Sequence, residues 1–257
     1  NALMVVSTQF KRQREEEEAS WEKIGNDEEL LLSAASKLSE EPVTKATACE
    51  RFIEKVILPR VLDLSAALHA GQYASSNLRE SIGCLYNRFP STVMDKLLAP
   101  VLLLPQGMSA GQCDLFTKAI TQKQSASGNV PEIIGTTLQW TLEVLAQQSS
   151  SASSTPAACK SMTQFLLKLI KPSSSPTQLS RQTLTNLISW MYREDSSPQS
   201  GARNFPLFAT LLGEIIVSST EEILSLPPQY LDQIRSIVSH HESSQRYNLA
   251  SKFQKLS

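Results

Sequence analysis

The feature that most constrains the fold is an apolar stripe at helical spacing, clearest between residues 75 and 105. In its first part, apolar residues are spaced at i, i+4, i+7, i+8 and i+11, which places them on one face of a helix. They are Leu78, Ile82, Leu85, Tyr86 and Phe89. Pro90 lacks an amide donor and should end this helix, and Ser91 can cap the next. The second stripe comprises Val93, Met94, Leu97, Leu98 and Val101. Together the two stripes predict an αα-hairpin.

Comparable stripes recur along the rest of the chain. They occupy residues 27–38, 49–57, 109–121, 131–145, 157–170, 184–192, 206–216, 230–238 and 249–256. No stretch shows the period of two that is typical of a strand, and nine glycines in 257 residues are too few for the turns of a β-sandwich. The sequence therefore predicts an all-α protein. Antiparallel helix pairs can bury such stripes in a compact bundle or, as we expect here, stacked as a degenerate HEAT-like α-solenoid without a fixed sequence period.

Several residues mark expected helix ends and connectors. Asn26 is a plausible N-cap, with Glu29 at the capping-box position of a helix that ends near Leu38. Pro59 interrupts the stripe at 49–57, so we expect a kink or a fresh turn there, with the side chain of Arg60 turned outward. By composition, the segments 125–129, 147–156, 173–176 and 194–204 are connectors.

Charge and composition divide the chain and narrow its function. Residues 1–25 are predicted to form a charged, partly ordered arm or linker, and residues 26–257 a helical-repeat domain, since 41% hydrophobic residues suffice for a sizeable core. Lys11-Arg12-Gln13-Arg14 is either a nuclear-import patch or, as composition favours, a solvated helix end. A net charge of −1 argues against nucleic-acid binding as the main task. Because the chain begins at Asn1, we expect a longer protein.

The four cysteines indicate a reduced core. Cys49, Cys84, Cys113 and Cys159 form no C-x-x-C pair, and each lies on or beside an apolar helix face. No apolar run approaches the ~20 residues that span a bilayer, and the first ten residues lack the features of a secretory signal. We therefore expect free thiols, an intracellular compartment and no membrane association.

No residue pattern in the sequence is typical of a catalytic, metal or cofactor site. His69 stands alone, and the adjacent His240 and His241 cannot face one ion from one helix face. Neither a G-x-S-x-G elbow nor a phosphate-binding glycine loop occurs. Arg246-Tyr247 and Lys252-Phe253 pair aromatic with basic residues, as single-stranded nucleic acid would require, but the pattern favours an ordinary amphipathic terminal helix. We expect a non-enzymatic protein without cofactors.

Two segments resemble the C-terminal helical domain of the Fanconi anaemia group E family. The first is SIGCLYNRFP followed by VMDKLLAPVL, with an aromatic-proline corner and the close Leu97-Leu98-Ala99-Pro100-Val101-Leu102. The second, residues 58–64, is similar to the family pattern L-x-R-[IV]-L-x-L. Together they cover 27 of the 257 residues. Neither segment is a catalytic signature.

This resemblance implies a non-catalytic adaptor in the nucleus. Such a subunit would tether the group C subunit within the Fanconi core complex, and present the heterodimeric substrate clamp to the ubiquitin ligase in interstrand-crosslink repair. It implies partner contacts at Arg60, Val61 and Leu62, and at Arg246, Tyr247 and Phe253 near the C-terminus. The sequence leaves two alternatives open: a helical nucleic-acid-binding domain, and a generic HEAT-like scaffold outside this pathway.

Overall fold

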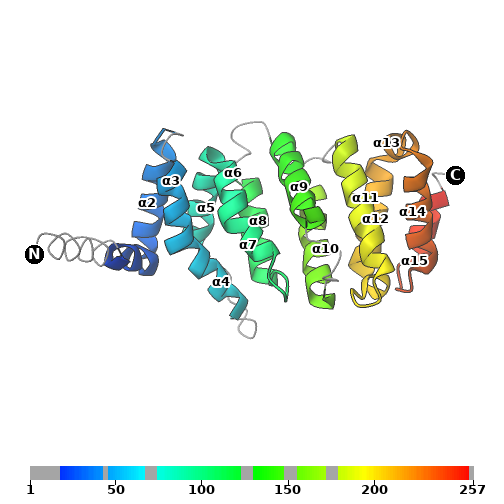
Figure 1. The fold of residues 1–257 in the computed structure, drawn as a ribbon, viewed down its shortest axis with the longest axis horizontal. Helices are drawn as coiled ribbons and strands as arrows, with labels where there is room; N and C mark the ends of the chain where they lie inside the picture. Colours follow the sequence, from blue (N-terminus) through cyan, green and yellow to red (C-terminus); the bar gives the residue numbers. More distant parts are fainter. Residues whose placement is uncertain are drawn as a thin grey trace, which may run out of the picture. The chain divides into compact units, whose positions relative to one another are not determined.

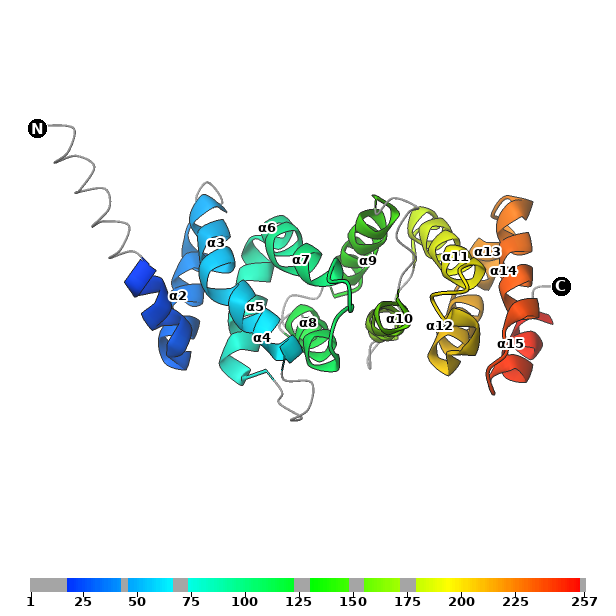
Figure 2. The same ribbon diagram turned by 60° about the horizontal axis from the view of Figure 1, so that its bottom comes forward.

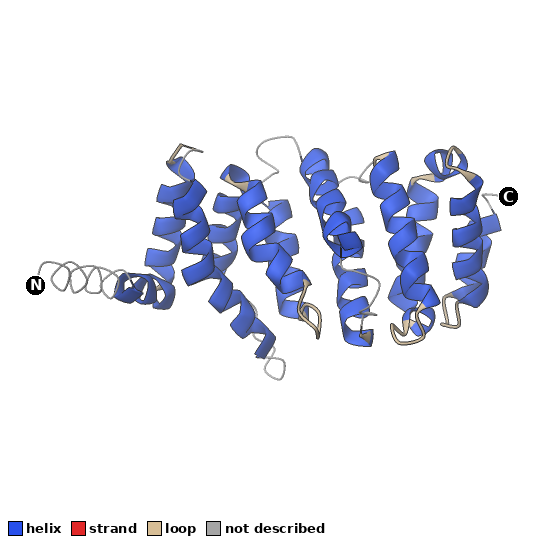
Figure 3. Ribbon diagram, in the orientation of Figure 1, coloured by secondary structure: helices blue, strands red, loops and turns tan. Residues whose placement is uncertain are grey.

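The computed structural model describes residues 18–42, 46–66, 74–122, 130–147, 155–171 and 179–254. Helices account for most of these residues, and none of the residues in these ranges forms a strand (Figure 3). The prediction of an all-α protein is thus confirmed. Contacts group the residues into two units, Asn1–Pro100 and Val101–Ser257, where the sequence suggested one domain from residue 26.

Unit 1 is built from two layers of helices. After a helix at residues 18–26 come α2 (Glu28–Glu40), α3 (Ala46–Phe52), η2 (Ile53–Ile57), α4 (Leu58–Ala66), α5 (Ser76–Arg88), α6 (Pro90–Val93) and η3 (Met94–Leu98), and α7 (Ala99–Leu102) begins at its end. One layer pairs α2 with α5, and the other sets α3 and η2 against α6 and η3 (Figure 1). The described part of the predicted arm is helical, and its Trp21 ring lies 6.1 Å from that of Phe52.

Two predicted helix starts in unit 1 are displaced by one or two residues. Asp27, not Asn26, caps α2, because its Oδ1 accepts hydrogen bonds from the amides of Glu29 and Leu30, both at 3.0 Å. At the α5–α6 corner Phe89, not Ser91, precedes the new helix, and Pro90 is its first residue. Proline is tolerated there because a first-turn amide has no helical partner.

A local repeat of 41 residues, not recognised in the sequence, runs through the second half of unit 1 and ends at Leu102. The two π-helical turns η2 and η3 begin 41 residues apart and have the same length, and a proline, Pro59 or Pro100, lies two residues after the end of each. Four equivalent pairs are buried: Ile53 and Met94, Val56 and Leu97, Ile57 and Leu98, Val61 and Leu102. A π turn adds one residue to a helical turn, so these helices absorb the proline without breaking. Helix α4 begins at Leu58, directly after the π turn, so Pro59 and Arg60 lie at the start of a fresh helical segment, one of the two outcomes expected.

Unit 2 consists of two rows of helices. Its elements are α8 (Ala110–Gln122), α9 (Val130–Gln147), α10 (Pro156–Ile170), α11 (Arg181–Ser196), η5 (Ala202–Asn204), α12 (Pro206–Ser218), α13 (Thr220–Leu224), α14 (Pro228–His240) and α15 (Arg246–Phe253). Side-by-side packing joins α8, α10, α12 and α15 in one row and α9, α11 and α14 in the other (Figure 2). The apolar stripes face each other between the rows, where Phe116, Phe165 and Phe208 are buried.

Residues 194–204 differ from the predicted loop. Helix α11 continues through Ser196, so Glu194 and Asp195 lie in its last turn, and residues 202–204 form a 3₁₀ turn. Gly201 links them with φ of 68°, a left-handed conformation that glycine adopts without strain. Ser200 Oγ donates to the Glu194 carbonyl oxygen at 2.5 Å and accepts from the Ala202 amide at 3.2 Å. The segment is a compact corner.

All four cysteines are free, and Cys49, Cys113 and Cys159 are buried, whereas Cys84 is half-buried. Burial raises the pKa of each of these three thiols to about 12. Among the helices that the structure describes, none has the length and hydropathy needed to cross a bilayer. The connectors at 125–129 and 173–176, and most of the one at 147–156, lie outside the described residues, as do His69, Leu256 and residues 11–14.

Candidate functional site

Arg60 is bound within its own unit. Its Nη1 donates a hydrogen bond to the carbonyl oxygen of Gly25 at 2.8 Å, and its Nη2 donates to the carboxylate of Glu28, with which it forms an ion pair. The side chain is 24% exposed. The predicted outward orientation of Arg60 is therefore wrong. Because α4 follows the π turn without a break, the chain stays helical at Arg60, and the guanidinium contacts the start of α2.

Glu28 makes this contact part of a larger network. Its other carboxylate oxygen accepts from Ser75 Oγ at 2.6 Å, and its carbonyl oxygen accepts from Asn77 Nδ2 at 3.2 Å. Ser75 Oγ in turn accepts from the Leu78 amide at 3.1 Å and so caps α5. Burial lowers the pKa of Arg60, and the paired carboxylate keeps the positive charge favourable there. The network joins α2, α4 and α5.

The two neighbours of Arg60 in the predicted patch differ in accessibility. Val61 is fully buried. It lies four residues after Ile57 and so continues the buried face of the preceding residues. Leu62 is half-buried. A partner could therefore reach Leu62 and part of Arg60, but not the side chain of Val61.

The C-terminal candidates lie together on α15, the last described helix. Arg246 is exposed, Tyr247 is 86% exposed and Phe253 is half-buried. Leu249 between them is buried and holds the helix to the core, as its stripe predicted. Tyr247 is the most exposed large apolar side chain among the described residues. An aromatic ring in water with one polar group is typical of an interface anchor.

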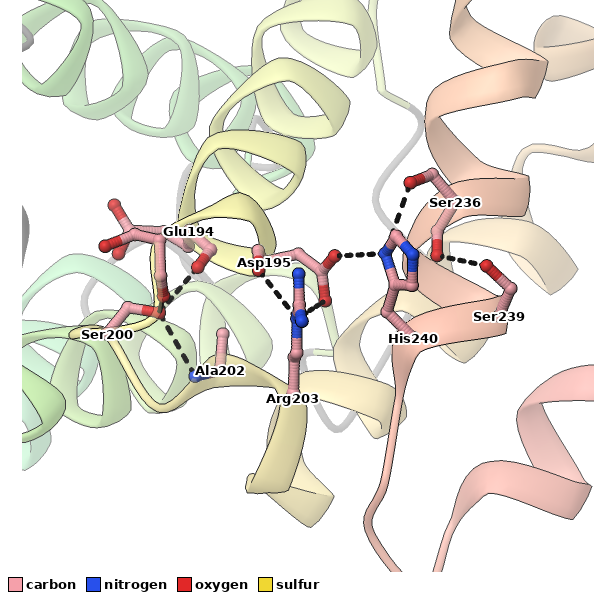
Figure 4. Close-up of polar contacts among 9 residues, drawn as sticks. Glu194, Asp195, Ser200, Ala202, Arg203, Ser236, Ser239 and His240 are labelled. Atoms are coloured by element: carbon pink, nitrogen blue, oxygen red, sulfur yellow. Dashed lines mark hydrogen bonds and ion pairs between the residues drawn. The ribbon is translucent and has the colours of Figure 1, made fainter.

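A polar cluster around Asp195 was missed in the sequence (Figure 4). Asp195 is fully buried; its carbonyl oxygen accepts from Arg203 Nε at 3.0 Å, and its Oδ1 lies 3.7 Å from the same nitrogen. Its Oδ2 lies 3.3 Å from His240 Nδ1. The amide of Glu242 donates to the Arg203 carbonyl oxygen at 2.9 Å. The cluster thus joins α11, the 3₁₀ turn and the end of α14.

The Asp195 cluster does not have the geometry of a catalytic triad. Ser236 Oγ lies 3.4 Å from His240 Nδ1, the same nitrogen that faces Asp195 (Figure 4). A serine triad needs the serine and the aspartate on opposite ring nitrogens, so that the base can accept one proton while the other is held. Burial raises the pKa of Asp195, and Arg203 and His240 oppose that shift. The arrangement serves to fasten helices.

Further chemistry has little support in the described residues. In the ranges that the structure covers, no three histidine, cysteine or acidic side chains gather as metal ligands would. His241, adjacent to His240, is instead buried with its Nε2 2.5 Å from Ser243 Oγ. No protein family, curated protein or solved structure matches the chain. Its function must therefore be argued from its surfaces.

Proposed function

We propose that this protein is a non-catalytic adaptor built as a HEAT-like α-solenoid. The observation that carries the proposal is the 41-residue recurrence of a π turn and a proline with equivalent buried residues, because HEAT repeats have periods of about 40–47 residues. The two-row packing of unit 2 is the arrangement that stacked helix pairs adopt. Such proteins act through extended surfaces on which other chains dock.

Within this class we propose the Fanconi core complex as the assembly and the nucleus as its location. The group C subunit would bind this adaptor, which would bring the substrate clamp to the ubiquitin ligase. This part rests on the resemblance of two sequence segments. Both contain the segment that follows a π turn, Leu58–Leu64 after η2 and Ala99–Leu102 after η3. This shared position after a π turn is one observation common to both segments, whereas residues 81–90 of the first segment lie before η3 and have no counterpart in residues 58–64.

That same observation favours a second candidate, a generic HEAT-like scaffold outside this pathway. A buried apolar pattern around a proline is dictated by packing, which any solenoid of this kind would share. The candidates differ in the partners they predict. Of the proposed contacts, Leu62 and Tyr247 are the most useful to test, because both reach the surface.

Affinity capture from nuclear extract, followed by mass spectrometry, tests the proposal. We expect the full chain to retain the group C subunit and other core-complex subunits. Tyr247→Ala should reduce their recovery, whereas Leu224→Ala, which also removes a half-exposed apolar side chain in unit 2, should not. Recovery of a different assembly would favour the generic scaffold. Retention of DNA that falls steeply with salt would favour nucleic-acid binding.

A further inference from the structure

One row of unit 2 carries a stripe of lysines across its helices. It consists of Lys118 on α8, Lys160 and Lys168 on α10, Lys171 directly after α10, and Lys252 on α15. On α10 the lysines follow i, i+8 and i+11 and so share one helix face, opposite the buried Phe165 and Leu166. We call these five residues the lysine stripe.

Two carboxylates lie within the stripe, and each is shared by two lysines. Asp114 lies 2.8 Å from the ammonium of Lys118 and 3.5 Å from that of Lys168. Glu214 lies 3.5 Å from Lys171 and 3.7 Å from Lys252. Burial alone would raise the pKa of Asp114, but its two lysines lower it, so the carboxylate stays ionised. The stripe therefore has five positive and two negative charges, and four of its lysines are held by carboxylates.

The rest of unit 2 has the opposite balance. Among its described helices, α9 and α13 each carry two glutamates and no lysine or arginine. In α11 and α14 the acidic residues are matched by arginines. The chain as a whole has a net charge of −1, so positive charge is concentrated on the row of α8, α10, α12 and α15.

Apolar side chains adjoin the stripe. Val217 lies one helical turn after Glu214 and is 55% exposed, and Phe253 follows Lys252 and is half-buried. A surface that combines ammonium groups with exposed apolar side chains fits a polypeptide with both acidic and apolar residues. Polynucleotide binding is less favoured, because the stripe has a surplus of only three positive charges.

We propose that the lysine stripe is the docking site for an acidic polypeptide segment of a partner. Each shared carboxylate leaves its two lysines with spare donors, because an ammonium has three N–H groups and each makes one contact here. Acidic side chains of the segment bind these donors, and its apolar side chains pack on Val217 and Phe253. The inference rests on the proposed adaptor function and adds the chemistry of one partner.

Fluorescence anisotropy with the purified full chain and a labelled peptide of glutamates interspersed with leucines tests this inference. We expect the chain to bind this peptide at low salt, and to bind its glutamine twin much more weakly. Lys171→Glu should weaken binding about threefold to tenfold. The matched control is Arg235→Glu, since both side chains are 65% exposed and paired with one carboxylate. It should change affinity less than about twofold.

Three outcomes would overturn the inference. The first is that the chain does not bind the glutamate peptide at low salt. The second is that Lys171→Glu and Arg235→Glu weaken peptide binding equally. The third is that the chain prefers a short DNA duplex, with a salt dependence of binding that Lys171→Glu reduces. The last outcome would assign the stripe to nucleic acid. The assay requires no natural partner. A failed peptide assay with successful capture from extract would therefore reject the stripe and retain the adaptor.

Discussion

Replacing Arg60 by alanine should destabilise unit 1 by about 2 kcal/mol. A hydrogen bond from a charged donor contributes about 1.5–3 kcal/mol, and the one to Gly25 has good length at 2.8 Å. The ion pair with Glu28, whose side chain is 38% exposed, adds about 0.5–1 kcal/mol. The 24% exposure of Arg60 lets water replace part of both contributions. Arg60→Glu should cost about 1 kcal/mol more, because two carboxylates would then face each other.

Urea unfolding followed by the fluorescence of Trp21 measures this loss. Trp21 lies in the same helix as Gly25, and its ring is close to that of Phe52 in unit 1. Its fluorescence therefore reports unfolding of the helix to which Arg60 is hydrogen-bonded. Trp140 and Trp190 are replaced by phenylalanine in the reference protein so that only this signal remains. Lys55→Ala is the control, since Lys55 is exposed on the adjacent η2 and should change stability by less than about 0.5 kcal/mol.

The outcome also decides how Arg60 relates to a partner. Exchange of the charges in Arg60→Glu with Glu28→Arg should restore part of the lost stability, because the pair is re-formed in reverse. Equal stability of Arg60→Ala and Lys55→Ala would refute the reasoning and return Arg60 to the set of free partner contacts. If Arg60→Ala does lower the stability, weaker capture of a partner by an Arg60 variant would not by itself locate an interface.

Two further predictions concern unit 2. Gly107→Ala should lower the free energy of unfolding by about 2–4 kcal/mol, because Gly107 has φ of 74° and a Cβ there would lie 2.4 Å from Ala158 Cα. Gly135→Ala in α9, where a Cβ meets open space, should raise it by about 0.5–1 kcal/mol. Urea unfolding measures both, and equal effects would contradict this account. Burial lowers the pKa of His241, so the unfolded chain binds the proton more readily and the unfolding free energy should fall as pH drops below about 6.5. His241→Gln should flatten that dependence, and an unchanged slope would assign it to another group.

The helices could be predicted because burial of one face imposes a spacing on the sequence. The stripes of α5, α10, α11 and α12 needed no information beyond that spacing. The π turns could not be predicted in this way. Val61 was predicted as a partner contact from the resemblance of residues 58–64, but it continues the stripe four residues after Ile57, and its side chain is in the core.

The polar clusters were harder to predict, because they join residues far apart in the chain. Arg60 meets Gly25 and Glu28 only when the start of α4 comes within side-chain reach of the start of α2, and a capping signal at Asp27 gives no hint of that contact. The Asp195 cluster had one available signal: the stripe of α11 continues past Met191 and places the two acidic residues within the helix. Residues 194–204 were nevertheless predicted to be a loop, because their composition is typical of a connector. The exposure of Tyr247 likewise depends on the position of α15 as the last described helix of its row.

The π turns also bear on which changes in chain length the protein can accept. Deletion of one residue from an ordinary α-helix puts every later side chain out of phase with the core. Deletion within residues 53–57 or 94–98 would shorten a five-residue turn to α-helical geometry, and the ring of Pro59 or Pro100 would then meet the carbonyl four residues earlier. Loss of a residue and loss of the proline would therefore have to occur together. Homologues that differ in length at these turns should differ at the proline as well.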